Sequence, residues 1–129
     1  MEKKILFLDK NIGRVGDYVD QHLEKTKNLK NDIPPFSSVE ISINGACNRR
    51  CAFCPRVNES EYPNILNSLD MSAFKKLIKD LVTINYDGRL AFSAFCEPLL
   101  TKNLHEYISI IKTSLPKSTV EIVSNGDVL

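Results

Sequence analysis

The sequence has no long apolar run and almost no excess charge of either sign. Seventeen basic against sixteen acidic residues leave a formal net charge of +1, which does not favour nucleic acid or an anionic membrane as the main partner. No stretch approaches the roughly 18 apolar residues that span a bilayer. The apolar residues 5–8 are also fewer than the roughly 7–15 of a secretory signal. We therefore expect a cytoplasmic protein that binds neither nucleic acid nor a membrane.

The composition is otherwise that of a globular protein. Hydrophobic residues make up 43% of the 129 positions and charged residues 26%, within the range of folded domains, and the length suits one small domain. The sequence contains no internal repeat. Because thiols stay reduced in the cytoplasm, its four cysteines are expected to bind metal rather than to form disulfides.

The first part of the chain gives weak signals. Residues 5–8 are compatible with a short strand and residues 15–29 with a polar helix, and Pro34-Pro35 then interrupts any regular element. We predict an N-terminal extension over residues 1–36 and a domain over residues 37–129.

From residue 39 the hydrophobic pattern predicts alternating strands and helices. Alternation or apolar content indicates strands at residues 39–43, 89–95 and 119–123. Between them, two apolar stripes at helical spacing indicate amphipathic helices, the first capped by Asp70 or Ser72. Residues 55–69 lack periodicity and are expected to form a long connection. The stripes consist of Phe74, Leu77, Ile78, Leu81 and Val82, and of Leu104, Tyr107, Ile108, Ile111 and Leu115.

This order predicts an α/β fold, a parallel βαβαβ sheet with right-handed crossovers. In such sheets ligands bind beyond the carboxyl ends of the strands. Three segments occupy these positions: the cysteine loop at residues 47–55, the segment 96–98 and the segment 124–126. We therefore expect the three segments to converge on one site.

The cysteine loop, residues 47–55, reads CNRRCAFCP and places Cys47, Cys51 and Cys54 within eight residues. Three thiolates from one short loop can hold a single [4Fe–4S] cluster, which often has four cysteine ligands. With only three cysteine ligands, one iron keeps an open coordination position. Catalytic zinc sites likewise keep an open position, whereas structural zinc sites do not. The spacing predicts a cluster on which chemistry can take place.

Two other readings of these cysteines remain. A structural zinc site would need a second cysteine pair or histidines at ligand spacing, whereas the chain adds only Cys96 and the isolated His22 and His105. Alternatively, Cys96 supplies a fourth cluster ligand and the protein transfers electrons. Either reading describes an iron–sulfur or zinc binding module without further chemistry.

The CxxxCxxC spacing, with the aromatic Phe53 before its last cysteine, resembles the signature of the radical S-adenosylmethionine (SAM) superfamily. Cys96-Glu97-Pro98 is similar to that family's Gly-Glu-Pro motif, and Ser124-Asn125-Gly126 to its Thr-Asn-Gly type of strand end. The resemblance covers about residues 37–129. The segments 39–55 and 89–100 look most like members with a C-terminal domain for a second cluster.

The resemblance implies that Cys47, Cys51 and Cys54 ligate three irons and that SAM chelates the fourth. Phe53 would lie near the adenine, the segment Cys96-Glu97-Pro98 near the methionine amino group, and Ser124 and Asn125 near the ribose or carboxylate. A one-electron donor such as flavodoxin or ferredoxin would reduce the cluster. Cleavage of SAM would then give a 5′-deoxyadenosyl radical that abstracts hydrogen from a substrate, which the sequence does not identify.

Three charged residues near the motifs have two readings each. Arg49 and Arg50 either favour the thiolates and raise the cluster's reduction potential or are solvent-facing loop charges. Glu97 either contacts the ligand or stabilises the start of a helix.

The chain departs from the family pattern in two respects. Cys96 replaces a glycine that would let the backbone approach a ligand closely. The family domain resembles a partial barrel of six βα units, of which this chain supplies three strands, so the third strand would expose an apolar edge. We therefore expect residues 37–129 to be the first half of a partial (β/α)6 barrel, in a fragment of a longer enzyme or beside a complementary C-terminal half.

Overall fold

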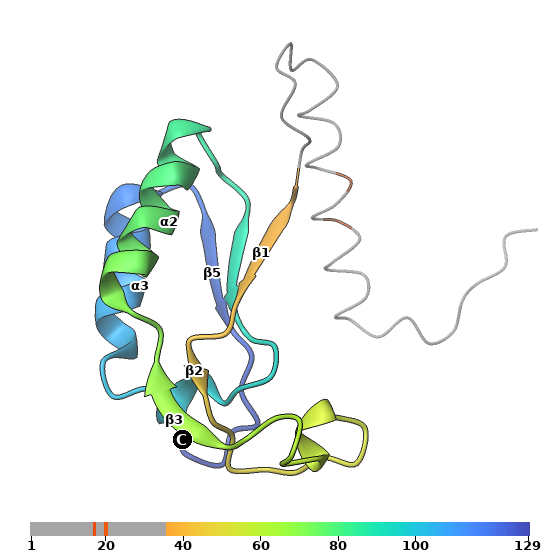
Figure 1. The fold of residues 1–129 in the computed structure, drawn as a ribbon. Coiled ribbons are helices and arrows are strands. Elements are labelled where there is room, and N and C mark those ends of the chain that lie inside the picture. Colours follow the sequence, from red (N-terminus) through yellow and green to blue (C-terminus); the bar gives the residue numbers. More distant parts are fainter. Residues whose placement is uncertain (1–16, 18–19, 21–35) are drawn as a thin grey trace, which may run out of the picture. The chain divides into compact units, whose positions relative to one another are not determined.

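A computed structural model of the chain describes residues 17, 20 and 36–129 (Figure 1). The expected strand at residues 5–8, and nearly all of the expected extension and of its helix at residues 15–29, lie outside the described residues. The account below concerns Ser38–Leu129, which form a unit of their own. Its elements are β1 (Ser38–Ile41), β2 (Asn44–Gly45), the 3-10 helix η1 (Pro55–Val57), β3 (Ile65–Ser68), α2 (Met71–Thr83), β4 (Arg89–Phe92), the 3-10 helix η2 (Pro98–Leu100), α3 (Leu104–Ser114) and β5 (Thr119–Ile122).

The expected parallel sheet is present, with β4 between β1 and β5. Ile41, Phe92 and Ile122 are register partners at the carboxyl ends of the three strands, so these ends lie at one edge. The first two strands stop earlier than their sequence pattern predicts. Beyond β4, Ala94 has a φ of 69°, a left-handed conformation that an extended strand cannot contain.

The two predicted helices are present, and α2 and α3 lie side by side on one side of the sheet (Figure 1). The α2 helix begins where Asp70 accepts a hydrogen bond from the Ala73 backbone N–H at 2.9 Å, which satisfies one of the unpaired first-turn donors. Most of the two predicted stripes is buried, but Val82 is exposed. The core between helices and sheet contains Ile41, Ile43, Phe74, Ile78, Leu81, Leu90, Phe92, Leu104, Tyr107, Ile111 and Leu115.

The long connection expected over residues 55–69 is present, and it contains regular structure that its lack of periodicity did not indicate. This segment contains η1 and β3, and β3 pairs antiparallel with the two-residue strand β2. All four residues of β3 are exposed, so burial imposes no alternation that a sequence could reveal. The backbones of β2 and β3 lie so close together at Gly45 that a Cβ atom there would be 2.7 Å from the Ile65 carbonyl oxygen.

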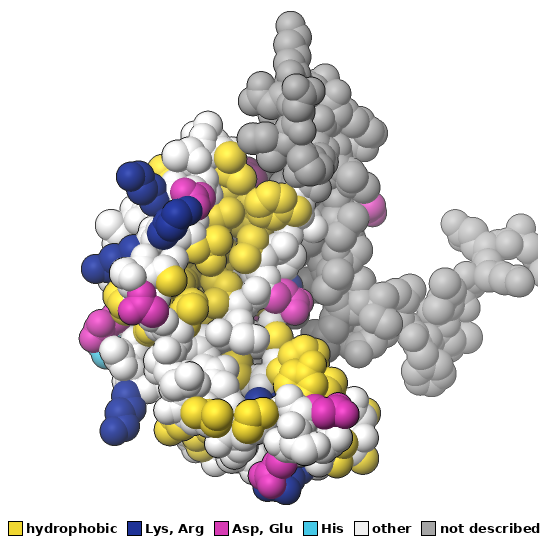
Figure 2. Space-filling model, in the orientation of Figure 1, with side chains coloured by type: hydrophobic (Ala, Val, Ile, Leu, Met, Phe, Trp, Pro, Cys, Tyr) yellow, Lys and Arg dark blue, Asp and Glu magenta, His cyan; other side chains and the backbone are white. Residues whose placement is uncertain are grey.

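Several large apolar side chains remain exposed. Figure 2 shows hydrophobic side chains gathered over the region of β3 and the loop before it, where Tyr62, Ile65 and Leu66 are exposed. Ile122 and Val123, at the end of β5, are exposed as well. Within residues 36–129, β5 pairs with β4 alone. Of the described helices, none is long and apolar enough to cross a membrane.

The centre of the core gives a first prediction. Phe74 is fully buried, and its ring packs against those of Phe92 and Tyr107 with centroids 6.4 and 4.9 Å away. We expect Phe74→Ala to lower the free energy of unfolding by about 3–5 kcal/mol. Val82→Ala, on the exposed side of the same helix, should change it by less than about 0.5 kcal/mol. Urea unfolding measures both, and equal losses would contradict this description of the core.

Candidate functional site

The ends of the three parallel strands are joined through Glu97, which is almost completely buried. Its backbone N–H donates to the Ala46 carbonyl at 2.8 Å, and its carbonyl accepts from the Asn44 side-chain amide at 2.9 Å. Its two carboxylate oxygens accept from the backbone N–H groups of Leu99, at 3.0 Å, and Asn125, at 2.9 Å. One residue therefore connects the segments that follow β1, β4 and β5.

Cys47 lies where these segments meet. Its sulfur is within hydrogen-bond distance of two donors, the Arg49 backbone N–H at 3.4 Å and the Asn125 side-chain amide at 3.8 Å. Its own backbone N–H donates to Asn64 Oδ1 at 2.9 Å. These contacts restrain the Cys47 side chain at its sulfur and at its backbone, and a cysteine sulfur is a ligand for iron.

The other two cysteines of the motif lie further along the loop and are as half-buried as Cys47. Cys51 and Cys54 are half-buried with free thiols, and the Cys54 backbone N–H donates to the Cys51 carbonyl at 2.9 Å in a tight turn. Phe53, between them, is 91% exposed. Its ring is available to a ligand and packs against nothing that would hold it in place.

The donors suit an iron–sulfur cluster, but they are not assembled for one. Soft thiolates are the ligands that such clusters use, and three are present in one loop. Among the described residues, however, no three His, Cys, Asp or Glu side chains are grouped so that they could hold a metal ion. The chemistry of the set therefore fits the predicted cluster.

Cys96 differs from the three loop cysteines in its surroundings. It is buried in the hydrophobic core, and its thiol donates to the Ser93 carbonyl at 3.3 Å. Pro98 is also buried and opens η2. Glu97 caps η2 through the Leu99 N–H, as the helix-start reading of this residue expects; contact with a ligand stays a prediction.

The remaining predicted residues follow β5. Ser124 Oγ accepts from the Gly126 backbone N–H at 2.9 Å, which keeps the hydroxyl proton available as a donor. The Asn125 side-chain amide donates to Asn48 Oδ1 at 2.8 Å as well as approaching Cys47. The structure thus brings Asn125 to the cysteine loop, whereas the hydrogen bond of Ser124 lies within its own turn.

The two arginines of the cysteine loop form exposed ion pairs. Arg49 Nε donates to Asp127 Oδ2 at 2.7 Å, with a second contact between the same side chains, and Arg50 pairs with Glu59. The side chains of Arg49 and Arg50 are 49% and 61% exposed. Water screens such charges strongly, so their pairing agrees better with the solvent-facing reading.

Sequence reasoning missed several residues of this site. Arg56 is buried and donates to the carbonyls of Phe95 and Gly45, at 2.9 and 3.0 Å, and to Asn64 Oδ1 at 2.6 Å. Asp127 was not singled out either, although its place two residues after Asn125 was a usable signal. Arg56 and Asn64 stand in a stretch without periodicity and gave none.

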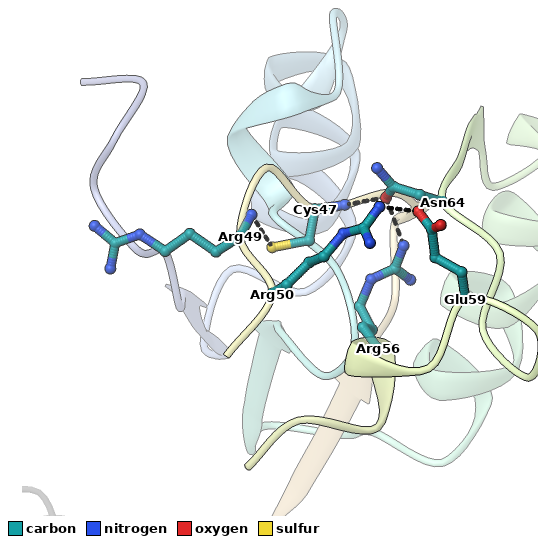
Figure 3. A pocket seen from close by; sticks show the side chains of 6 residues that line it. All are labelled: Cys47, Arg49, Arg50, Arg56, Glu59 and Asn64. Carbon is teal, nitrogen blue, oxygen red and sulfur yellow. Dashed lines mark hydrogen bonds and ion pairs between the residues drawn. The ribbon is translucent and has the colours of Figure 1, made fainter. Parts of the chain in front are cut away.

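Figure 3 shows how the loop residues lie around a small pocket. The side chains of Arg50, Arg56, Glu59 and Asn64 point toward one another, whereas the Arg49 guanidinium points away from them (Figure 3). Cys47 also lines this pocket.

Comparison with known proteins gives one relative and two solved structures, while no family model matches the chain. The relative is the S-adenosyl-L-methionine-dependent 2-deoxy-scyllo-inosamine dehydrogenase of Niallia circulans, 33% identical over 94 residues, which are 73% of this chain and 37% of the relative. The structure of BtrN in complex with AdoMet and 2-DOIA matches with a TM-score of 0.67 and 32% identity, over 73% of this chain and 37% of that one. The structure of selenomethionine BtrN in an open conformation matches with a TM-score of 0.65 and 31% identity, over 77% of this chain and 42% of that one.

Sequence and fold therefore agree that this chain is related to a SAM-dependent dehydrogenase. The likeness supports the radical SAM relation that the cysteine motif predicted. The chain spans well under half the length of each protein that it matches.

The Arg49–Asp127 pair gives a second prediction. The hydrogen bond from Arg49, and its charge, hold the pKa of the Asp127 carboxyl below its usual range. A depressed folded-state pKa contributes stability that is present above the unfolded value of about 3.9 and is lost as the pH falls through the folded pKa. We expect Arg49→Gln to raise the pKa of Asp127 toward its ordinary value in an NMR titration.

Arg50→Gln is the matched control, because Arg50 pairs with Glu59 instead. An Asp127 titration that is the same in the parent and in Arg49→Gln would show that the ion pair is not formed in solution.

Proposed function

We propose that residues 36–129 form the cluster- and SAM-binding part of a radical SAM enzyme. The observation that carries the proposal is the meeting of three strand-end segments at Cys47, made through Glu97 and Asn125. The likeness to BtrN in complex with AdoMet supports it. The reaction class would be that of the relative, a SAM-dependent oxidation of a small substrate.

In this proposal Cys47, Cys51 and Cys54 hold a [4Fe–4S] cluster. When bound, the cluster and SAM supply reductive cleavage of SAM and removal of a hydrogen atom from the substrate. The protein's part is to orient the ligands and exclude water. Two N–H groups already face the Cys47 sulfur, so this ligand is held in place before the others.

The SAM-binding residues would lie around Glu97. Because both of its carboxylate oxygens accept from backbone N–H groups, the backbone of the Cys96–Pro98 segment would meet the amino group of SAM. The Ser124 hydroxyl and Asn125 amide would serve its ribose or carboxylate, and the exposed Phe53 would cover its adenine. The Glu97 side chain, whose two oxygens are both hydrogen-bonded, would then keep these SAM-binding groups at fixed positions relative to one another.

The proposal includes partners of two kinds. A one-electron donor such as flavodoxin or ferredoxin would reduce the cluster. Further strands, from the same protein or from a complementary half, would extend the sheet at β5 toward a partial (β/α)6 barrel. The exposed Ile122 and Val123 support this extension, because an apolar strand edge open to water tends to pair.

Anaerobic reconstitution with iron and sulfide tests the cluster ligands. We expect Cys47→Ala, Cys51→Ala and Cys54→Ala each to lose most of the bound iron and of the visible absorbance, because a cuboidal cluster held by two thiolates is poorly retained. Cys96→Ala is the matched control and should keep both. Unchanged iron content in the three loop variants would exclude this ligand set.

Electron paramagnetic resonance of the reduced cluster tests SAM binding. We expect SAM to change the spectrum of the parent protein, because SAM would occupy the iron that lacks a protein sulfur. Asn125→Ala should require a higher SAM concentration for the same change. Asn103→Ala, at the exposed N-terminus of α3, should not. A spectrum that SAM leaves unaltered would favour the alternative of an iron–sulfur or zinc module without SAM chemistry.

A further inference from the structure

Within the part of the chain that the structure describes, Arg56 is a buried cation without a carboxylate partner. Its exposed fraction is 7%, and its three hydrogen bonds go to the carbonyls of Phe95 and Gly45 and to the side-chain amide of Asn64. Among the described residues, no Asp or Glu lies within ion-pair distance of it. Burying a charge costs several kcal/mol unless an opposite charge compensates it.

The surroundings of Arg56 do not supply that compensation. Three arginines and one carboxylate line the pocket in Figure 3. Arg49 is neutralised by Asp127 and Arg50 by Glu59. One positive charge is left over, and it belongs to the most buried of the three side chains.

The uncompensated charge lies close to the first cysteine of the motif. Asn64 Oδ1 accepts from Arg56, at 2.6 Å, and from the Cys47 backbone N–H, at 2.9 Å. Arg56 also holds the Gly45 carbonyl, two residues before Cys47. The buried guanidinium is thus linked to Cys47 through one shared acceptor, the exposed Asn64. Salt screens a buried charge less than an exposed one.

We propose that Arg56 is the counter-charge of the anionic iron–sulfur cluster and raises its reduction potential. The inference rests on the proposed function, since it presumes the cluster. Reduction adds a negative charge to the cluster, and a buried cation nearby stabilises the reduced form more than the oxidised one. Arg56 is a positioning residue, because it acts on the cluster's environment and supplies no ligand.

The test is redox potentiometry of the reconstituted full chain, followed by electron paramagnetic resonance. Arg56→Gln removes the charge but retains a hydrogen-bonding side chain. We expect it to reduce the ratio of reduced to oxidised cluster at a fixed potential about tenfold, equivalent to a potential about 59 mV lower for one electron. Arg56→Lys keeps the charge and should stay within about threefold of the parent, as should the control Arg50→Gln, which removes an exposed and paired charge.

The proposal fails if Arg56→Gln folds, binds the cluster and keeps the parent's potential, even where its thermal stability falls. It also fails if Arg56→Lys lowers the reduction potential as much as Arg56→Gln does. The hydrogen bonds of Arg56, and not its charge, would then account for the change in potential. If Arg56→Gln does not retain a cluster, Asn64→Asp decides, since a carboxylate at the shared acceptor would neutralise Arg56 without removing it. A lower potential in that variant supports the counter-charge, and an unchanged one overturns it.

The parent separates this inference from the proposed function. Failure of the parent to bind a cluster counts against the proposed function, and the inference falls with it. A parent that binds both cluster and SAM, together with an Arg56→Gln variant of unchanged potential, rejects the inference alone.

Discussion

The buried Glu97 side chain is the interaction on which the geometry of the site depends. A parallel sheet brings the ends of its strands to one edge, but it does not fix the loops that leave them. Glu97 fixes them, because its backbone bonds to Ala46 and Asn44 and its carboxylate to Leu99 and Asn125. Hydrogen bonds to a carboxylate are among the stronger ones in proteins, and here both oxygens have backbone partners. The positions of the three loops are therefore set by the protein itself.

The cysteine loop is supported from two sides of this centre. From the β5 side, Asn125 reaches Cys47 and Asn48, and Asp127 reaches Arg49. From the β3 side, Asn64 holds the Cys47 backbone and is itself held by Arg56. These contacts all fall on the first part of the loop. The part with Cys51 and Cys54 is held mainly by its own turn.

The regular parts of the fold were predictable because burial imposes a period on the sequence. The stripe from Phe74 to Leu81 and the alternation from Val39 to Ile41 correspond to α2 and β1 in the structure. The β2–β3 pair could not be predicted this way, because β3 is exposed at every position and β2 has two residues. The two strands approach closely at Gly45, and a backbone contact of this kind leaves no hydrophobic pattern in the sequence.

The candidate site was predictable to the extent that topology determines it. Strand order alone indicated that Cys47, Glu97 and Asn125 would meet, and they do. The roles of the nearby charged residues were not predictable, because the arginines differ in how deeply they are buried and the sequence does not show this difference. Arg49 and Arg50 adjoin the cysteines in sequence but are exposed and paired, whereas Arg56, in η1, is buried.

The unequal support of the three cysteines explains how the loop can suit a cluster without being assembled for one. Cys47 is restrained at both its sulfur and its backbone N–H, while Cys51 and Cys54 lie on a half-exposed turn. In the proposed site Cys47 would be the ligand that the protein restrains most, and Cys51 and Cys54 would be the two that only their turn restrains. Binding of the proposed cluster and ordering of this loop would then be coupled, and the buried charge of Arg56 would offset part of the negative charge of the cluster.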